Sequence, residues 1–181
     1  MLAAPHLTKG AVGSARIAGV ELRVAVEDDA EAIRGIYNVY VENSTFTFDL
    51  RPRSLTEQRA WLAARSGAHT ALVAEDAGTV VGFGSLSPYR DRPAYATSVE
   101  DSVYVSPDEQ GRGIGKLVLG GLLETAAASG FHAVFARIVG GHEASIGLHE
   151  SFGFELVGTE REVGRKFGRW LDVVVMQRLL R

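Results

Sequence analysis

Residues 110–116 place three glycines at alternate positions of a short polar turn, Gln-Gly-Arg-Gly-Ile-Gly-Lys. The turn lies between a stretch typical of a strand and one typical of a helix, and the first amides of a helix have no partner within it. Glycines let an anion approach that backbone closely, and the helix dipole, Arg112 and Lys116 add positive potential. The pattern therefore predicts a site for phosphate groups.

Two common nucleotide-binding patterns do not fit this turn. The Walker A pattern needs glycine where Gln110 stands and Ser or Thr where Leu117 stands. The dinucleotide fingerprint, begun at Gly111 or Gly113, needs a third glycine where Lys116 or Val118 stands. From these residues alone, a tight strand-to-helix connection that binds nothing is the alternative.

A second segment, residues 142–154, reads His-Glu-Ala-Ser-Ile-Gly-Leu-His-Glu-Ser-Phe-Gly-Phe. The first turn resembles the Gln/Arg-x-x-Gly-x-Gly/Ala signature of the GNAT acetyltransferases. The second segment resembles their Asn-x-x-Ala-x-x-Leu-Tyr-x-x-x-Gly-Phe signature, in the expected order and spacing. The Leu and Gly-Phe positions match in identity, whereas His142, Ser145 and His149 replace Asn, Ala and Tyr.

Within this family the chain is similar to the phosphinothricin and methionine sulfone/sulfoximine N-acetyltransferases. The matching runs are residues 36–38, 99–105, 144–149 and 163–172. In that subfamily His is the expected residue at position 149. The resemblance spans residues 22–180 and implies an α+β GNAT fold, with a mixed, mostly antiparallel sheet of about seven strands flanked by helices. It also implies a homodimer that uses acetyl-CoA.

The same resemblance implies how acetyl-CoA is held. The backbone of Val103 and Val105 is expected to contact the acetyl and pantetheine groups, because an open strand edge offers unpaired amides. His142 stands where the family has an Asn that bonds the pantetheine arm or the thiol region. The residues expected to bind acetyl-CoA are Val103, Tyr104, Val105, Gln110, Gly111, Arg112, Gly113, Ile114, Gly115, Lys116, His142 and Ser145.

Transfer of an acetyl group to an amine requires a base, because most α-amines are ammonium ions at neutral pH. Glu100 is the leading candidate: it lies in an apolar strand and matches the catalytic Glu of the subfamily. Asp101 should point to the opposite face of the strand unless a bulge interrupts the alternation. A structural ion pair between Glu100 and Arg90 or Arg92 is the alternative.

His149 is the candidate acid for the leaving thiolate, because a histidine can donate a proton near neutral pH. A helix histidine satisfied by a neighbour is an equally good interpretation of this residue, and Tyr104 is another candidate acid. The chain has no cysteine, which removes the commonest covalent route and favours direct attack of the amine on the thioester.

Two arginines precede the candidate base, and arginine binds carboxylates with two parallel hydrogen bonds. The residues expected to bind the acceptor are Arg90, Asp91, Arg92, Glu100, Asp101 and Ser102. Solvated loop arginines are the alternative. A late loop carrying Lys166, Phe167, Arg169 and Trp170 suits either a small anionic ligand or a dimer interface, and Phe46 and Phe48 suit either a pocket wall or the core.

These groups need a frame of strands and helices to bring them together. Hydrophobic periodicity and turn residues predict strands at residues 22–26, 69–75, 79–87, 96–106, 133–139, 155–162 and 170–179. They predict helices at about 28–42, 54–66, 113–129 and 143–152, the second beginning with a capping box from Ser54 to Glu57.

Length and composition limit the remaining possibilities. The chain has 181 residues, which suits one domain, with a flexible extension expected over 1–20 and the acetyltransferase domain over 21–181. The net charge of −3 gives no footprint for nucleic acid, and no apolar run reaches the roughly 20 residues that cross a bilayer. The five histidines are scattered, so no metal site is expected, and we expect a cytoplasmic protein.

The sequence thus favours an acetyl-CoA-dependent N-acetyltransferase acting on a small amino-acid-like amine of the phosphinothricin, methionine sulfoximine or methionine sulfone type. Two other functions stay open. One is an acetyl-CoA-binding module without turnover. The other is acetylation of a protein terminus or a polyamine, although paired arginines suit an anionic acceptor better than a polyamine.

Overall fold

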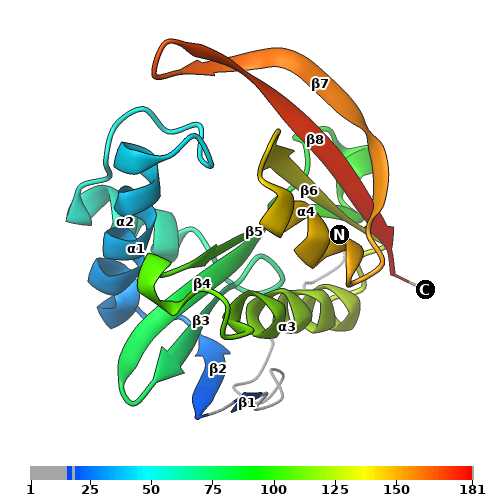
Figure 1. The fold of residues 1–181 in the computed structure, drawn as a ribbon. Coiled ribbons are helices and arrows are strands. Elements are labelled where there is room, and N and C mark those ends of the chain that lie inside the picture. Colours follow the sequence, from blue (N-terminus) through cyan, green and yellow to red (C-terminus); the bar gives the residue numbers. More distant parts are fainter. Residues whose placement is uncertain (1–15, 18, 181) are drawn as a thin grey trace.

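The computed structural model describes residues 16–17 and 19–180 and shows one eight-stranded sheet of order β1-β2-β3-β4-β5-β6-β8-β7 (Figure 1). The strands are β1 (Arg16–Ile17), β2 (Val20–Val24), β3 (Ala71–Asp76), β4 (Thr79–Pro88), β5 (Ser98–Val105), β6 (Ala133–Val139), β7 (Glu155–Lys166) and β8 (Arg169–Leu179). The helices are α1 (Ala30–Asn43), α2 (Leu55–Ala63), α3 (Ile114–Ala128) and α4 (Glu143–Glu150), with short 3-10 turns at Glu27–Asp29, Pro93–Tyr95 and Pro107–Glu109.

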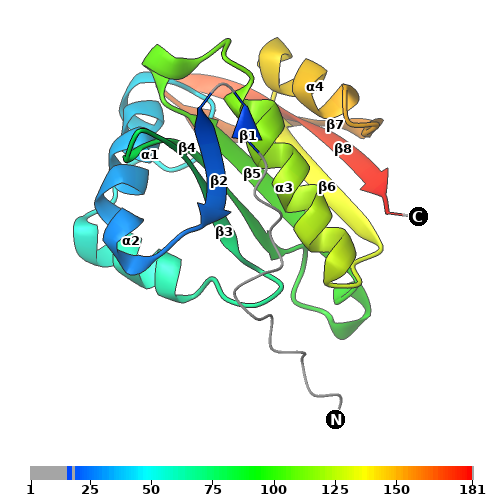
Figure 2. The same ribbon diagram turned by 90° about the horizontal axis from the view of Figure 1, so that it is seen from below.

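The helices cover the two faces of the sheet unequally. On one face, helix α3 packs across β2 to β5 and α4 contacts β6 (Figures 1 and 2). On the other face, α1 packs against β4 and β5, and α2 packs against α1. Each face has its own buried core: Leu119 and Leu122 lie in the α3 core, and Ile33 and Phe83 in the α1 core. The sheet therefore separates two environments, and alternate residues of β5 reach each of them.

The pair formed by β5 and β6, near the centre of the sheet, differs from the other strand pairs. Among the paired strands described, β5 and β6 alone run parallel, and they pair only at Ser98 with Ala133, Val99 with Val134 and Glu100 with Phe135. β5 continues for five residues beyond that point while still paired with β4 on its other edge. The two strands therefore diverge, and one edge of β5 is left without a partner strand.

Most of the predicted framework is confirmed. The fold is α+β with a mixed, mostly antiparallel sheet, and α2 begins with the predicted capping box: the Glu57 amide donates to Ser54 Oγ at 3.2 Å, and the Ser54 amide donates to Glu57 Oε2 at 2.7 Å. The predicted hairpin between β3 and β4 turns at Ala77 and Gly78, both with positive φ.

Several details of the predicted framework change, and β2 and α2 end at Val24 and Ala63, two and three residues before their predicted ends. The sheet has eight strands rather than about seven, because Arg16 and Ile17 pair with β2. Residues 1–15 and 18 of the expected extension lie outside the described residues.

The prediction of a late loop from Lys166 to Trp170 is wrong, because β7 extends to Lys166 and β8 begins at Arg169. Only Phe167 and Gly168, with φ of 48° and 74°, form the turn of this hairpin. Helix α4 ends at Glu150, two residues before the predicted end.

Glycines in β4 allow α3 to lie close against the sheet. A Cβ atom built on Gly84 would lie 2.6 Å from Val118 Cγ1, 2.8 Å from Leu122 Cδ1 and 2.8 Å from the Ser102 carbonyl oxygen. The last of these is backbone and cannot turn away. Because α3 begins at the glycine-rich turn, this close packing also fixes where that turn lies relative to β5.

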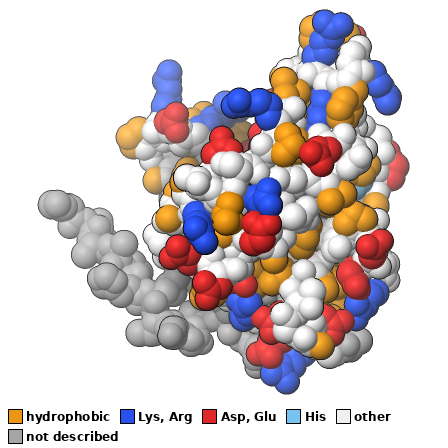
Figure 3. All heavy atoms as spheres, turned by 90° about the vertical axis from the view of Figure 1, so that its left-hand side faces the viewer, with side chains coloured by type: hydrophobic (Ala, Val, Ile, Leu, Met, Phe, Trp, Pro, Cys, Tyr) orange, Lys and Arg blue, Asp and Glu red, His pale blue; other side chains and the backbone are white. Residues whose placement is uncertain are grey.

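The outer surface over α1 and α2 mixes acidic and basic side chains rather than gathering one sign (Figure 3). None of the helices within residues 16–17 and 19–180 is long and apolar enough to span a membrane.

We expect Gly84→Ala to destabilise the protein by about 1–3 kcal/mol, because the added methyl group overpacks the contact between α3 and β4. For a chain of this size that corresponds to a Tm lower by roughly 2–12 °C, measured by thermal unfolding. Gly147→Ala is the control, because a Cβ at that position meets nothing within 4 Å. Equal Tm values for Gly84→Ala and the unmodified chain would contradict the packing argument.

Candidate active site

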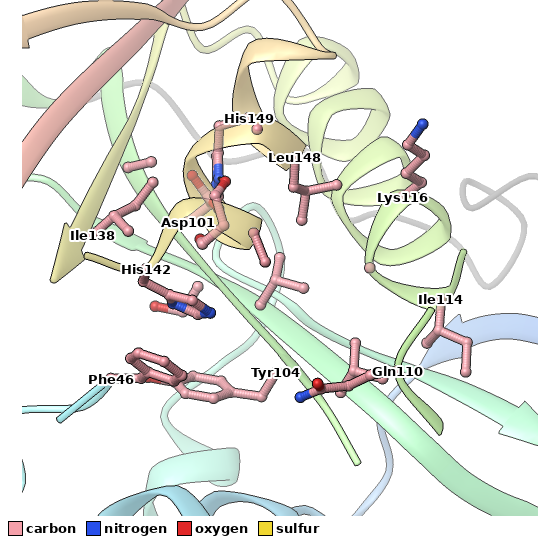
Figure 4. A pocket seen from close by; sticks show the side chains of 18 of the residues that line it. Phe46, Asp101, Tyr104, Gln110, Ile114, Lys116, Ile138, His142, Leu148 and His149 are labelled. Carbon is pink, nitrogen blue, oxygen red and sulfur yellow. Dashed lines mark hydrogen bonds and ion pairs between the residues drawn. The ribbon is translucent and has the colours of Figure 1, made fainter. Parts of the chain in front are cut away.

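A cavity of about 630 Å³ opens where β5 and β6 diverge, between the N-terminus of α3 and α4 (Figure 4). This volume suits a small-molecule ligand. The predicted site residues that line it are Asp101, Ser102, Val103, Tyr104, Val105, Gln110, Gly111, Gly113, Ile114, Gly115, Lys116, His142, Ser145 and His149. The predicted residues that do not line it are Arg90, Asp91, Arg92, Glu100 and Arg112.

The glycine-rich turn forms one end of the cavity. Gly111 and Gly113 have φ values of 78° and 82°, which other residues rarely adopt, and Gly113 is the N-cap of α3. The first amides of α3, at residues 114–116, have no acceptor within the helix and lie at the cavity wall. The turn can therefore bind an anion through its backbone, as its sequence predicts.

Of the two basic residues of this turn, Lys116 lines the cavity and Arg112 does not. The Arg112 guanidinium donates to Asp76 Oδ2 at 2.7 Å and also pairs with Glu109, which does line the cavity. Lys116 is exposed and extends away from the other labelled side chains (Figure 4). Anion binding at the turn thus depends on backbone amides more than on the two side-chain charges.

The free edge of β5 forms the floor of the cavity. The Ser106 amide donates to Val81 O on the β4 side, so by strand alternation the amide groups of Val105 and Val103 point to the opposite edge. There the Tyr40 hydroxyl donates to Val105 O at 2.5 Å, and Gln110 Nε2 donates to the Tyr40 oxygen at 2.9 Å. These two bonds tie α1, β5 and the glycine-rich turn together.

Tyr40 was missed as a site residue. Its helical spacing indicates a core position, and its ring is indeed buried. The signal that could have found it is its hydroxyl group, since a buried Tyr O–H almost always needs a partner.

His149 and Asp101 form a buried pair across the cavity (Figure 4). His149 Nε2 lies 3.0 Å from Asp101 Oδ2, and His149 Nδ1 lies 2.7 Å from the Ser145 carbonyl oxygen. A carbonyl only accepts, so Nδ1 carries a hydrogen, and a proton on Nε2 is donated to Asp101. Burial alone would lower the pKa of His149, but the bonds to Asp101 and Ser145 outweigh it and raise that pKa.

Asp101 keeps a second oxygen free. Its Oδ1 atom is buried and has no hydrogen-bond partner among the described residues. Such an atom usually has a ligand or water as its partner. Asp101 therefore holds His149 with one oxygen and keeps the other buried without a partner among the described residues, and the acceptor binding expected of it stays a prediction.

Glu100 lies on the other face of β5. The β4–β5 register runs from Gly82 with Val105 to Pro88 with Val99 without a shift, so no bulge interrupts the alternation. Asp101 bonds to α4, whereas the Glu100 face is the one on which Tyr104 contacts Tyr37 of α1. Burial raises the pKa of Glu100, and the positive charge of Arg137 opposes that rise.

The three loop residues expected to bind an acceptor are exposed. Among them, Arg90 lies 5.0 Å from the Tyr89 ring centre, and its charge acts on Glu100; no such effect links Arg92 or Asp91 to Glu100. The alternative of a direct ion pair is not observed, since Glu100 forms no ion pair with either arginine in the described chain.

Aromatic contacts close the cavity from the α1–α2 side. Phe46 stacks on His142 with ring centres 3.6 Å apart, and burial lowers the pKa of His142 (Figure 4). Phe48 packs against Gly164 of β7 instead, and Lys166, buried rather than loop-exposed, donates to the Thr47 carbonyl at 2.9 Å. The β7–β8 hairpin therefore holds the loop that carries Phe46 in place.

Tyr104 is poorly suited to donate a proton. Its ring packs between Tyr37 and Phe83, and burial raises its pKa to about 12. His149 is thus the better placed of the two candidate acids.

A parallel strand pair that diverges beside an anion-binding helix terminus is an arrangement suited to an enzyme that binds an extended, phosphate-bearing substrate. Residues 22–175 match the acetyltransferase (GNAT) domain family. The chain therefore belongs to the GNAT acetyltransferases, as its two motifs predict, and is an acetyltransferase enzyme.

Individual relatives indicate which kinds of GNAT acetyltransferase this chain is similar to. The chain is 46% identical over 167 residues to the phosphinothricin N-acetyltransferase of Streptomyces coelicolor, covering 90% of this chain and 98% of that protein. It is 42% identical over 158 residues to an L-methionine sulfoximine/L-methionine sulfone acetyltransferase of Pseudomonas paraeruginosa, covering 86% and 92%.

A solved structure carries the same fold. The phosphinothricin acetyltransferase of Sinorhizobium meliloti in complex with acetyl-CoA superposes with a TM-score of 0.86 at 41% identity, covering 90% of this chain and 89% of that one. The chain is thus closely related to the phosphinothricin and methionine sulfoximine/sulfone acetyltransferases.

Replacing Asp101 with Asn should lower the pKa of His149, because the anion that raises it is removed and the effect of burial remains. The measurement is the NMR titration of the His149 ring. Asp108→Asn, at an exposed position, is the control and should leave the titration unchanged. An unaltered His149 titration in Asp101→Asn would show that the pair does not determine its protonation.

Proposed function

We propose that this enzyme transfers an acetyl group from acetyl-CoA to the α-amine of a small amino acid resembling phosphinothricin, methionine sulfoximine or methionine sulfone. The amine attacks the thioester directly. The observation that carries the proposal is the divergence of β5 from β6, which opens the free edge of β5 and the first amides of α3 into one cavity.

The residues present fit acetyl-CoA. The amides of residues 114–116 suit its pyrophosphate. The amide groups of Val103 and Val105 on the free edge of β5 suit the amide-rich pantetheine arm, as one strand suits another. An N–H group of that edge near the thioester oxygen would also stabilise the negative charge that develops there during attack.

Glu100 is proposed as the general base. It accepts the proton that the acceptor nitrogen loses as the carbon–nitrogen bond forms, directly or through one water. Its half-buried position supports this role, because burial brings the pKa of a carboxyl group closer to neutrality. Its place on the α1 face separates it from the cavity wall formed by α4.

His149 is proposed as the general acid. Asp101 stabilises the charged His149 ring by accepting its Nε2 proton in a hydrogen bond. When the carbon–sulfur bond breaks, the thiolate competes with Asp101 Oδ2 for that proton, and the bond to Asp101 is lost as the proton moves to sulfur. The Ser145 carbonyl holds the other ring nitrogen and so fixes the ring orientation. The base and the acid thus act from opposite faces of β5.

For the acceptor carboxylate we propose Arg90 rather than Arg92. Of the two, only Arg90 has a charge that acts on Glu100, so a carboxylate next to the reacting amine would lie within its influence. Asp91 and Ser102 remain candidates for polar contacts with the acceptor.

We also propose a homodimer formed through the β7–β8 hairpin. The exposed apolar residues of these strands are Leu156, Val157, Val163 and Trp170; β7 is the edge strand of the sheet and β8 lies next to it. Light scattering should give twice the mass of the chain, and Trp170→Asp should reduce it to the mass of one chain. A monomeric unmodified protein would contradict this proposal.

Acceptor-dependent release of free thiol from acetyl-CoA tests the proposed reaction. We expect turnover with phosphinothricin, methionine sulfoximine and methionine sulfone, and none with a polyamine or a peptide N-terminus. Glu100→Gln should lower kcat/KM by about 10²–10⁴. Glu124→Gln makes the same change at an exposed position of α3 and should leave kcat/KM unaltered.

The other outcomes discriminate between the alternatives. Acetyl-CoA binding without thiol release for any amine would favour a module without turnover. Release with the peptide or the polyamine alone would replace the amino-acid acceptor. Full activity of Glu100→Gln would remove Glu100 as the base.

A further inference from the structure

An ion pair between β6 and β7 lies in the active-site region and has no role in the mechanism above. Arg137 donates to both carboxylate oxygens of Glu160, from Nη1 to Oε1 at 2.8 Å and from Nη2 to Oε2 at 2.5 Å. Both side chains are half-buried, and Arg137 lines the cavity. A two-pronged pair of this kind fixes the guanidinium geometry more tightly than a single bond would.

Strand register places this pair on the same face of the sheet as Glu100. Glu100 lies opposite Phe135 on β6, and Arg137 is two residues further along that strand, so its side chain points to the same side. Glu160 lies opposite Val173, which lies opposite Val139 of β6. Glu100, Arg137 and Glu160 therefore form a row across the sheet on the α1 side, with Arg137 in the middle.

The charged groups around Glu100 come from four elements. Arg137 is on β6, Asp101 is adjacent on β5, Arg90 is in the loop after β4, and Glu160 is on β7. After burial, Arg137 has the largest effect on the pKa of Glu100, and it favours the ionised form. Arg137 itself faces Glu160, Glu100 and Tyr89.

The side chain of Arg137 is fixed in position more firmly than that of Arg90, the other cation near Glu100. Arg90 is exposed on a loop, whereas Arg137 extends from a strand paired with β8 along its whole length and is anchored by Glu160. A fixed charge beside a buried carboxyl group acts on it without having to be positioned at each turnover.

We propose that Arg137 is a positioning residue for the base, that its guanidinium holds Glu100 in the ionised form, and that Glu160 anchors this guanidinium while partly cancelling its charge. This inference rests on the proposed role of Glu100. Because the two partners carry opposite charges, their removal should affect Glu100 in opposite directions. Loss of the cation should make Glu100 harder to ionise, and loss of Glu160 should make it easier.

The test measures Glu100 itself before it measures activity. The ¹³C side-chain carboxyl signal of Glu100, assigned by its loss in Glu100→Gln, is titrated by NMR in the full chain and in the variants Arg137→Gln, Glu160→Gln and Arg137→Lys. Arg161→Gln is the control: it removes an exposed arginine next to Glu160. The pH dependence of kcat/KM is then recorded for the same proteins.

We expect the Glu100 midpoint to rise by about half a pH unit or more in Arg137→Gln and to fall by a similar amount in Glu160→Gln. Arg137→Lys, which keeps the charge without the two-pronged contact, should stay closer to the unmodified protein than Arg137→Gln does. The acid limb of kcat/KM should move with the NMR midpoint. A purely structural pair would change Tm in both variants in the same direction and leave the midpoint unaltered.

Midpoints that do not move, or that move in the same direction in both variants, would overturn the inference. Opposite NMR shifts without a matching shift in the acid limb would uphold the link between Arg137 and Glu100 but overturn Glu100 as the base. Selective loss of binding of amino acids that carry a carboxylate in Arg137→Gln, with the Glu100 midpoint unchanged, would make Arg137 an acceptor-binding residue and would also overturn the inference.

Discussion

The short parallel contact between β5 and β6 is the constraint on which the rest of the site depends. Three residue pairs hold the strands together, and beyond Glu100 they separate. Separation leaves backbone amides of β5 without a strand partner, a cost that a buried sheet normally avoids. A substrate with amide groups can satisfy them. The same divergence opens the space that α4 and the N-terminus of α3 enclose, so one irregularity in the sheet creates both the binding edge and the cavity.

The second organising feature is the alternation of β5. Consecutive residues, Glu100 and Asp101, point to opposite faces because no bulge interrupts the strand. Asp101 supports His149 on the α4 side, while Glu100 lies among Arg137, Arg90 and Glu160 on the α1 side. The proposed base and the proposed acid thereby have different environments and are kept apart by the thickness of a single strand. Separate environments allow one group to stay ionised and the other protonated at the same pH.

The features that could be predicted from the sequence are mostly local ones, formed by residues close together in the chain. The glycine-rich turn, the capping box at Ser54 and the turn at Ala77–Gly78 each depend on a few adjacent residues. The interactions that were missed join residues far apart in the chain: Tyr40 to Val105 across 65 residues, His149 to Asp101 across 48, and Arg137 to Glu160 across 23. Spacing along one element does not reveal such partners, because strand order and register decide them. Arg112 shows how a distant partner can overturn a local prediction. Its place in the glycine-rich turn predicts a role in anion binding, but its guanidinium pairs with Asp76 and Arg112 does not line the cavity.

In the proposed mechanism, β5 separates the base Glu100 from the acid His149, with the thioester between them. The most direct test is a crystal structure with CoA and an N-acetylated amino-acid product bound together. We expect the product nitrogen within about 3 Å of Glu100, or one water away, and the CoA sulfur within hydrogen-bond reach of His149. A product nitrogen on the His149–Asp101 side, or a CoA sulfur remote from the free edge of β5, would contradict it.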